Sequence, residues 1–346
     1  MASRTTLTAL LLVSLLWNGA VQDSGGSQTR RRSVYAAVFL NSGSGAVGTT
    51  NDIGLFKRGV GETAWRSIYR PNLFIFGLGW WQRGSTQRFY IAAGNGLHRS
   101  SDGGRSWRIL TSWETAEALS VALDPIDSSL IYIAMPFGIF KSTDDGAHWV
   151  KSISGMKKWF VRRVVIGEND RRTLYAAAED DLYRTTDGGE SWRGLHVGVP
   201  GILSVLALNS DTLLAGTEDH GVRVSLNGGK SWQGGEAIPQ TAIYVLQKSP
   251  DGKLVYAAGF MSGLWKSVDS GVSWSLLWGA PNVEAIYAMA VDPRESDHLL
   301  VGTNGQGVYE SCDGGTSWSS AGLEGAHVTH IEMEPEDGSP WKNQNP

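Results

Sequence analysis

Two stretches, Ser100-Ser101-Asp102-Gly103-Gly104-Arg105-Ser106-Trp107 and Ser142-Thr143-Asp144-Asp145-Gly146-Ala147-His148-Trp149, share the pattern Ser/Thr-x-Asp-x-Gly-x-x-Trp. Four further copies follow, and a degenerate copy ends at Trp65. The polar and aromatic positions of the six intact copies are Asp102, Asp144, Asp187, Asn227, Asp269 and Asp313, with Trp107, Trp149, Trp192, Trp232, Trp274 and Trp318. Counted from Trp65, the successive Trp residues are 42, 42, 43, 40, 42 and 44 positions apart. A period near 42 is typical of four-stranded propeller blades, so seven copies predict a seven-bladed β-propeller.

The residues of the pattern have separate tasks. Asp-Gly or Asn-Gly between two apolar runs predicts a tight hairpin, because such a turn needs residues that tolerate positive φ. The carboxylate accepts hydrogen bonds from backbone N–H groups of the turn, and the Ser or Thr hydroxyl closes it from the other side. The Trp begins the next strand and is expected to pack between neighbouring sheets, where each ring contributes roughly 4–6 kcal/mol of gross burial.

Apolar alternation divides each repeat into four strands. In the third repeat the expected strands are Ala118–Leu123, Leu130–Met135, Gly138–Ser142 and Trp149–Ser152. The first repeat has only three, at Val34–Leu40, Gly54–Lys57 and Trp65–Ile68. We expect the unassigned stretch Val328–Met333 to supply the missing inner strand and close an all-β ring, which would remove the exposed edges of an open sheet.

Composition limits the class of protein. The 346 residues are 41% hydrophobic and carry a formal net charge of −4, which argues against nucleic acid as a partner. Cys312 is the single cysteine, so no intramolecular disulfide can form. Arg4 followed by the apolar stretch Leu7–Trp17 predicts a signal peptide over residues 1–20 and an exported protein. Its 11 apolar-rich residues are too few to span a bilayer.

The domain prediction divides the mature chain into a disordered linker at 21–32, a propeller at 33–335 and a disordered tail at 336–346. The expected state is a monomer with no cofactor. A metal site in the repeated turns is not expected, because each turn offers one carboxylate where calcium needs several oxygen ligands.

The repeated turns resemble the Asp-box, or BNR, repeat of sialidases, xyloglucanases, the sortilin ectodomain and photosystem II assembly factors. The stretch from Leu123-Asp124-Pro125 to Ile139-Phe140-Lys141-Ser142-Thr143-Asp144 is most similar to blades of the xyloglucanase and sortilin type. The resemblance implies that ligands bind on the face opposite the boxes. It also implies that a xyloglucanase forms its cleft between two propellers, with one acid from each. The same scaffold serves hydrolases and binding proteins, so it leaves function open.

Loops on the face opposite the turns are therefore the expected location of a site. Aromatic side chains near them, which suit sugar faces or peptide side chains, are Trp113, Trp159, Phe160 and Trp278. A basic cluster that suits a carboxylate or an acidic peptide comprises Lys157, Lys158, Arg162 and Arg163. Shielding of the blade ends and a solvated surface are the alternatives for these two groups, and alternation places at least one of the two arginines on a packed face.

Acidic residues occupy corresponding turns of two successive blades, Glu179-Asp180 in the fourth and Glu218-Asp219-His220 in the fifth. Glycoside hydrolysis requires two carboxyl groups about 5–9.5 Å apart, and neighbouring blades can bring such turns together. Short turns favour acidic residues in any case, so a purely structural role is the alternative.

Short loops and the lack of a complete catalytic set favour a non-catalytic binding or assembly propeller that holds a protein or peptide partner. The ligand-binding candidates are Trp113, Lys158, Trp159, Arg162, Arg163, His220 and Trp278. The alternative is a secreted glycoside hydrolase, of sialidase or xyloglucanase type, that uses Glu179, Asp180, Glu218 or Asp219 on a carbohydrate.

Overall fold

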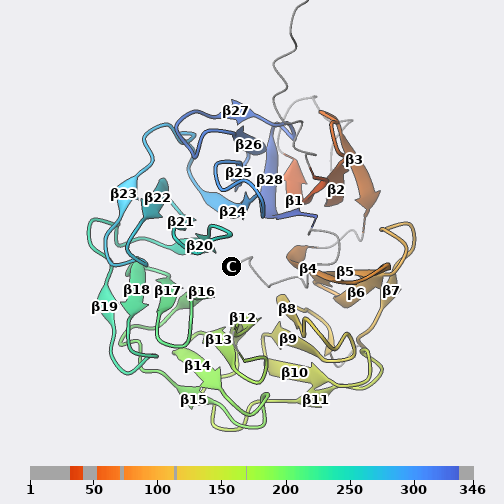
Figure 1. Cartoon of the computed structure of the whole chain (residues 1–346). Helices are drawn as coiled ribbons and strands as arrows, with labels where there is room; N and C mark the ends of the chain where they lie inside the picture. Colours follow the sequence, from red (N-terminus) through yellow and green to blue (C-terminus); the bar gives the residue numbers. More distant parts are fainter. Residues whose placement is uncertain (1–31, 42–52, 71–73, 113–114, 169, 335–346) are drawn as a thin grey trace, which may run out of the picture. The chain divides into compact units, whose positions relative to one another are not determined.

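The computed structural model describes residues 32–41, 53–70, 74–112, 115–168 and 170–334. The predicted signal peptide, most of the linker and the C-terminal tail lie outside these ranges. The described residues form seven antiparallel sheets of four strands each. Figure 1 shows the sheets as blades around a common axis, with β4, β8, β12, β16, β20, β24 and β28 innermost. The predicted seven-bladed β-propeller is confirmed.

The first four blades follow the predicted repeat boundaries closely. From the axis outward, blade 1 contains β28 (Ala326–Met333), β1 (Val34–Asn41), β2 (Gly54–Arg58) and β3 (Trp65–Tyr69). Blade 2 contains β4 (Ile75–Arg83), β5 (Thr86–Ala93), β6 (Gly96–Ser100) and β7 (Arg108–Ile109). Blade 3 contains β8 (Ser120–Leu123), β9 (Ile131–Met135), β10 (Gly138–Ser142) and β11 (Val150–Lys151). Blade 4 contains β12 (Val161–Ile166), β13 (Leu174–Ala178), β14 (Leu182–Thr185) and β15 (Arg193–Gly194).

The last three blades repeat the same order, and their outer strands are two residues long, as in blades 2 to 4. Blade 5 contains β16 (Ile202–Ala207), β17 (Leu213–Thr217), β18 (Val222–Ser225) and β19 (Gln233–Gly234). Blade 6 contains β20 (Ile243–Lys248), β21 (Val255–Gly259), β22 (Leu264–Ser267) and β23 (Ser275–Leu276). Blade 7 contains β24 (Ile286–Val291), β25 (Leu299–Thr303), β26 (Val308–Ser311) and β27 (Ser319–Ser320). Among the described residues, no helix is long and apolar enough to cross a bilayer.

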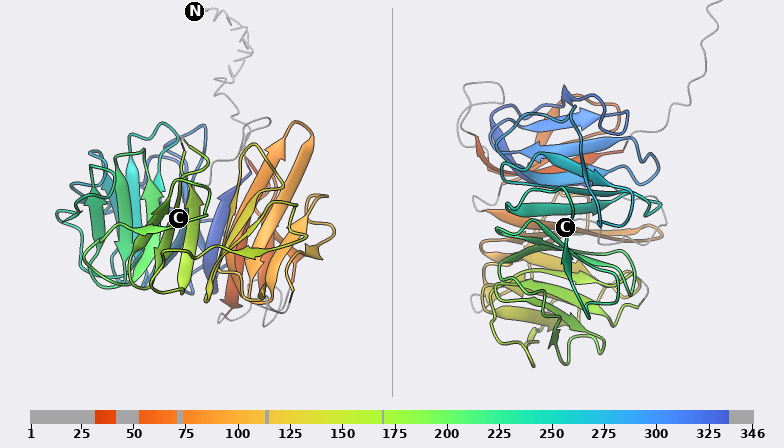
Figure 2. Two further views of the ribbon diagram at one scale, coloured as in Figure 1. Left: turned by 90° about the horizontal axis from the view of Figure 1, so that it is seen from below. Right: turned by 90° about the vertical axis from the view of Figure 1, so that its left-hand side faces the viewer.

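The ring closes where the two ends of the propeller pair. Strand β28 runs antiparallel to β1, with Val34 opposite Met333 and Ala36 opposite Ile331. Figure 2 shows β28 side by side with the early strands of the chain. The predicted closure by a C-terminal strand is therefore confirmed, and it satisfies the inner edge of β1 without a further strand.

The hydrophobic core consists of seven clusters, one at each interface between adjacent blades. Each repeat Trp packs into the cluster that its blade shares with the preceding blade, as predicted. Trp149, for example, lies with the buried residues Tyr90, Leu97 and Ile133 between blades 2 and 3. Its indole Nε1 also donates a hydrogen bond to the Leu110 carbonyl of blade 2, at 3.0 Å.

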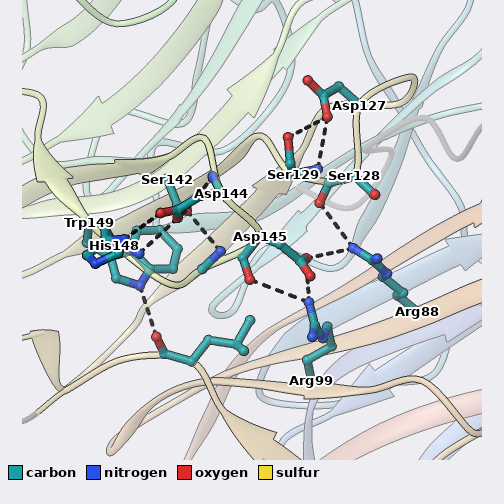
Figure 3. Close-up of polar contacts among 12 residues, drawn as sticks. Arg88, Arg99, Asp127, Ser128, Ser129, Ser142, Asp144, Asp145, His148 and Trp149 are labelled. Carbon is teal, nitrogen blue, oxygen red and sulfur yellow. Dashed lines mark hydrogen bonds and ion pairs between the residues drawn. The ribbon is translucent and has the colours of Figure 1, made fainter.

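Figure 3 shows the turn that presents this Trp. Ser142 Oγ donates to Asp144 Oδ1 at 2.9 Å and accepts the Gly146 N–H at 2.9 Å. Asp144 Oδ1 also accepts the His148 N–H at 2.8 Å. The next residue, Asp145, forms ion pairs with two arginines of blade 2, Arg88 at 2.6 Å and Arg99. The turn thus fixes its own backbone and anchors its blade to the preceding one.

Deleting part of the side chain of Ile331 should weaken the closure. Ile331 in β28 is fully buried between blades 7 and 1. Ile331→Ala is expected to lower the free energy of unfolding by about 2–5 kcal/mol, because the packed seam cannot collapse around the cavity. Denaturant unfolding measures it, and Ile126→Ala, at a position 56% exposed, is the control with an expected change within about 0.5 kcal/mol. Equal losses in both variants would contradict a stabilising role of the closing strand.

The repeated turns should also make stability acid-sensitive. Hydrogen bonds from the Ser106 hydroxyl and N–H lower the pKa of Asp102 to about 2, and bonds from His148 lower the pKa of Asp144 to about 2. A pKa below the usual value of 3.8 means that the contribution is complete above that value and is lost as the pH falls towards 2. Thermal unfolding midpoints should drop across this interval.

Asp102→Asn tests the cause, because Asn227 already occupies the same position in blade 5. Asn227 Oδ1 accepts the Ser231 N–H at 2.9 Å and its Nδ2 donates to Ser231 Oγ at 2.7 Å. The variant should therefore keep the turn and show a smaller midpoint drop between about pH 4 and pH 2 than the natural protein. An identical drop would exclude the Asp102 carboxylate as a source of the acid sensitivity.

Candidate functional site

The loops that join second to third strands, and each blade to the next, lie at the end of the strands opposite the repeated turns. We call this side the loop face. Five inner strands begin there with a register shift after their first residue, in blades 2, 4, 5, 6 and 7. A β-bulge leaves one residue outside the ladder and re-aims its side chain. The five bulged residues are Phe76, Arg162, Leu203, Tyr244 and Tyr287.

Two of these residues form an aromatic pair near the axis. The rings of Tyr244 and Tyr287 have centroids 5.1 Å apart at an interplanar angle of 45°. The pKa of Tyr244 is raised by burial and by the charges of Tyr287 and Glu218, and Arg162 opposes the rise. Groups influence one another in this way only when they are close. Arg162, Tyr244 and Tyr287 occupy the same bulge position of blades 4, 6 and 7, at the loop-face end of the inner strands.

Backbone hydrogen bonds connect the acidic turns of blades 4 and 5. Glu179 N–H donates to the Phe160 carbonyl at 3.0 Å, Gly201 N–H to the Glu179 carbonyl at 2.7 Å, and Glu218 N–H to the Gly201 carbonyl at 2.9 Å. Gly201 is thus hydrogen-bonded to Glu179 on one side and to Glu218 on the other. Because adjacent bonded strands are about 5 Å apart, the backbones of the two glutamates are separated by about 10 Å. The two glutamates are therefore joined, through their backbones, on either side of Gly201.

The link between the two acidic turns depends on Gly201 being a glycine. Its φ is +70°, a conformation that L side chains rarely adopt. A Cβ added to Gly201 would lie 2.9 Å from both Cβ and Oε2 of Glu218. The absence of a side chain at Gly201 therefore allows the Glu218 side chain to lie against the link between the two blades.

Basic and aromatic groups flank the carboxylates. Lys158 Nζ donates to Glu179 Oε1 at 3.1 Å, and both side chains are half-exposed. The ammonium group of Lys151 lies 4.6 Å from the ring centroid of Trp159, and the guanidinium group of Arg162 lies 5.1 Å from that of Phe160. Of the predicted residues, Lys158 thus contacts Glu179, and Glu218 is joined to Glu179 through Gly201, while Trp159 and Arg162 follow Lys158 closely in the chain. With Tyr244 and Tyr287 we call them the loop-face cluster.

The remaining acidic candidates are held by their neighbours. Asp180 Oδ2 accepts a hydrogen bond from Tyr183 OH at 2.7 Å, at the border of a pocket of about 360 Å³ that His196 and Lys157 also line. Asp219 forms an ion pair with His220. Of the four carboxylates, Glu179 and Glu218 are therefore the two that flank Gly201.

Arg163, predicted with the ligand-binding residues, faces the interior instead of the loop face. Burial lowers its pKa to about 10, although Glu332 of the closing strand opposes the fall. Burial and the Arg163 charge together lower the pKa of His330 to about 3. As alternation required, one arginine of the Arg162-Arg163 pair is packed while Arg162 is exposed.

The two other predicted tryptophans do not join the cluster. Trp113 lies outside the described residues. Trp278 is 88% exposed, and its neighbour Gly279 lies against the Thr316 and Gly315 carbonyls of the repeated turn of blade 7. This places the start of the loop between blades 6 and 7, with Trp278, beside the repeated turn of blade 7.

Sequence reasoning missed Tyr244 and Tyr287. A signal was present, because each follows the isoleucine that begins an inner strand, as do Phe76 and Leu203. Aligning the repeats on that isoleucine places all four at one position. Periodicity alone did not identify them, because an alternating strand pattern assigns one of two faces to each residue and does not predict a bulge.

No family model matches the chain. Xyloglucanase Xgh74A of Acetivibrio thermocellus is 23% identical over 294 residues, which covers 64% of this chain and 34% of that protein. Relatives from Paenibacillus sp and Hypocrea jecorina are also named xyloglucanase, and the chain spans 20% and 26% of their lengths. The chain thus spans only a fifth to a third of the curated relatives that it matches.

Solved structures agree on the fold. The GH74 xyloglucanase from Xanthomonas campestris superposes with a TM-score of 0.60 at 20% identity, over 74% of this chain and 46% of that one. The structure of YCF48 bound to D1 peptide superposes with a TM-score of 0.55 at 18% identity, over 71% of this chain and 81% of that one. At such identities the likeness concerns the propeller alone.

The expectation of a non-catalytic binding or assembly propeller is wrong on this evidence. The matching curated relatives named above are hydrolases, and they support the alternative, a glycoside hydrolase. That expectation rested on the lack of a complete catalytic set in the sequence. It did not anticipate that Gly201 links the two acidic turns and that two tyrosines stand beside them.

Gly201→Ala should displace Glu218, and Gly198→Ala is its matched control. Both glycines have positive φ, at +70° and +86°, but a Cβ at Gly198 meets no atom within 4 Å. We expect both variants to lose about 1 kcal/mol from backbone strain, and Gly201→Ala to lose more because Glu218 must move. Denaturant unfolding and crystal structures of both variants measure this. An unmoved Glu218 in Gly201→Ala would contradict the close packing.

Proposed function

We propose that the protein is a glycoside hydrolase that acts on a xyloglucan-type polysaccharide, with Glu179 and Glu218 as its two carboxyl groups. The observation that carries this proposal is the pair of glutamates on adjacent blades, joined through Gly201, in a chain whose curated relatives are xyloglucanases. The relatives supply the substrate class. The resemblance implies that a xyloglucanase takes one acid from each of two propellers, and the pair proposed here departs from that arrangement because both glutamates lie on one propeller.

We infer an inverting reaction, because Gly201 stands between the backbones of the two glutamates and leaves space there. In that reaction one carboxylic acid protonates the leaving glycosidic oxygen, and the other carboxylate removes a proton from a water molecule that attacks the anomeric carbon from the opposite side. The two groups need room for that water between them, and backbones about 10 Å apart provide it. A retaining enzyme would need its carboxyl groups within about 5.5 Å.

The other members of the cluster supply binding. Tyr244 and Tyr287 present ring surfaces beside Glu218, and ring surfaces suit the apolar faces of sugars. Trp159 extends the aromatic surface past Glu179 on the side of blade 3. We infer that a glycan chain lies across the loop face from the Tyr244 side to the Trp159 side, with the bond to be cleaved above Gly201.

We further infer that the repeated turns are Asp-box repeats that have a structural role. In blade 4, as in blade 3, the hydroxyl and the carboxylate bond each other and the backbone of the turn: Thr185 Oγ1 donates to Asp187 Oδ1 at 2.6 Å, and Ser191 N–H donates to the same oxygen at 3.0 Å. Because these carboxylates accept hydrogen bonds within their own turns, they are not available to a ligand. The apolar stretch Leu7–Trp17 supports export to where such polysaccharides occur.

Replacing either glutamate should abolish hydrolysis. We expect Glu179→Gln and Glu218→Gln to lower the release of reducing sugar from xyloglucan by about 10²–10⁴-fold, because each removes a proton-transfer group. Glu190→Gln, in the repeated turn of the same blade 4, is the matched control and should retain full activity. Added azide should form a glycosyl azide only with the variant that lacks the general base, which assigns the two roles. Hydrolysis unchanged in both variants would refute the pair, and no hydrolysis by the natural protein would refute the activity.

A further inference from the structure

A second group of reactive side chains lies in blade 7, away from the loop-face cluster. His298 precedes β25, Glu310 is in β26, and Cys312 follows β26 in the repeated turn. One potential ligand atom of each, an imidazole nitrogen, a carboxylate oxygen and the Cys312 sulfur, all lie within 4.8 Å of one another. His298 and Glu310 are largely buried, whereas Cys312 is exposed.

The strand register explains why they meet. Strands β25 and β26 are antiparallel, with Leu299 opposite Ser311 and Leu300 opposite Glu310. Extending that register by one residue places His298 opposite Cys312. Side chains two apart on a strand share one face of the sheet, so Glu310 and Cys312 lie on the same side as His298.

The imidazole of His298 is already oriented as metal-binding histidines are. Its Nδ1 lies 3.2 Å from Asp292 Oδ2, and the other oxygen of Asp292 accepts the Arg294 N–H at 2.9 Å. In metal sites, a ligating histidine commonly donates its second ring N–H to a carboxylate, which fixes the tautomer and the direction of the ring. Here that arrangement directs Nε2 towards Glu310, at 2.7 Å from Oε1.

Two features compete with a metal. Burial lowers the pKa of His298, but hydrogen bonds to Asp292 and Glu310 outweigh it and raise the pKa to about 9, so a cation must displace a proton from Nε2. Arg58 of blade 1 also donates to Glu310 Oε2 at 3.0 Å and to Oε1 at 3.1 Å. A carboxylate has about four lone-pair positions, and Glu310 can therefore keep Arg58 on one oxygen while the other turns to a metal.

We propose that His298, Glu310 and Cys312 bind a divalent transition-metal ion of the zinc class. Thiolate, imidazole and carboxylate are the ligand types that zinc accepts, at about 2.0–2.3 Å, and a water completes the tetrahedron. Hard cations such as calcium prefer oxygen ligands throughout, so the sulfur and nitrogen exclude them. The site lies at the seam where Arg58 joins blade 1 to blade 7, and it does not depend on the hydrolase proposal.

The single cysteine makes a direct test possible. In the full chain, the reaction of Cys312 with a thiol reagent such as DTNB reports on this site alone. Addition of Zn²⁺ should slow that reaction at least about tenfold, because the metal holds the thiolate that reacts. Co²⁺ should give a sulfur-to-cobalt charge-transfer absorption band, and chelation with EDTA should reverse both effects.

Two variants separate a built site from adventitious binding to a thiol. His298→Gln should lose the protection by Zn²⁺, whereas His148→Gln should keep it, because His148 bonds Asp144 in a similar turn that contains no cysteine. Cys312→Ser, at an exposed position, should keep the fold and lose the cobalt band. This second variant tests the site even if His298→Gln, at a buried position, fails to fold. Zinc protection that is absent in the natural protein, or that persists equally in His298→Gln, would overturn the proposal.

Discussion

The structure depends on the burial of one indole ring at each interface between blades. A four-stranded sheet with two-residue outer strands has too little surface of its own to form a core, so each blade buries its faces against its neighbours. The repeated turn holds the Trp at the correct place for this, because its hydroxyl and carboxylate fix the backbone just before the ring. A fully buried ring, as at Trp192 and Trp274, contributes roughly 4–6 kcal/mol of gross burial between blades, and a partly buried ring contributes less.

The residues that stabilise the ring and the candidate site residues lie at opposite ends of the strands. The repeated turns use their carboxylates internally, so under the proposed function the reacting carboxyl groups come from the opposite ends of the strands. There the loops are short and tied to one another by backbone hydrogen bonds such as those through Gly201. A short, bonded loop on a rigid ring positions a side chain more accurately than a long loop does. The bulges add side chains that the regular ladder would direct between the blades.

The ring closure joins blade 1 to blade 7 by several kinds of interaction. Blade 1 lacks an intact turn at Trp65, and the ion pair of Arg58 with Glu310 joins it to blade 7 in place of the missing turn bonds. The Trp65 indole still donates to the Ala321 carbonyl of blade 7 at 2.7 Å. The seam therefore combines strand pairing, apolar packing and buried charge, and the buried charges are what bring His298 and Glu310 together beside Cys312.

The sequence by itself determined the number of blades, the strand boundaries within a few residues and the closing strand, because a repeat fixes each of these through local turn chemistry and apolar period. It also offered Glu179, Glu218, Lys158, Trp159 and Arg162 as candidates from residue type. Only the tertiary structure decided that these lie together while Arg163 turns inward and Trp278 lies beside the turns. It also decided that Tyr244 and Tyr287 stand beside Glu218. Contacts between blades and the aim of a bulged residue depend on how sheets about 42 residues apart are rotated against each other, and no local pattern encodes that angle.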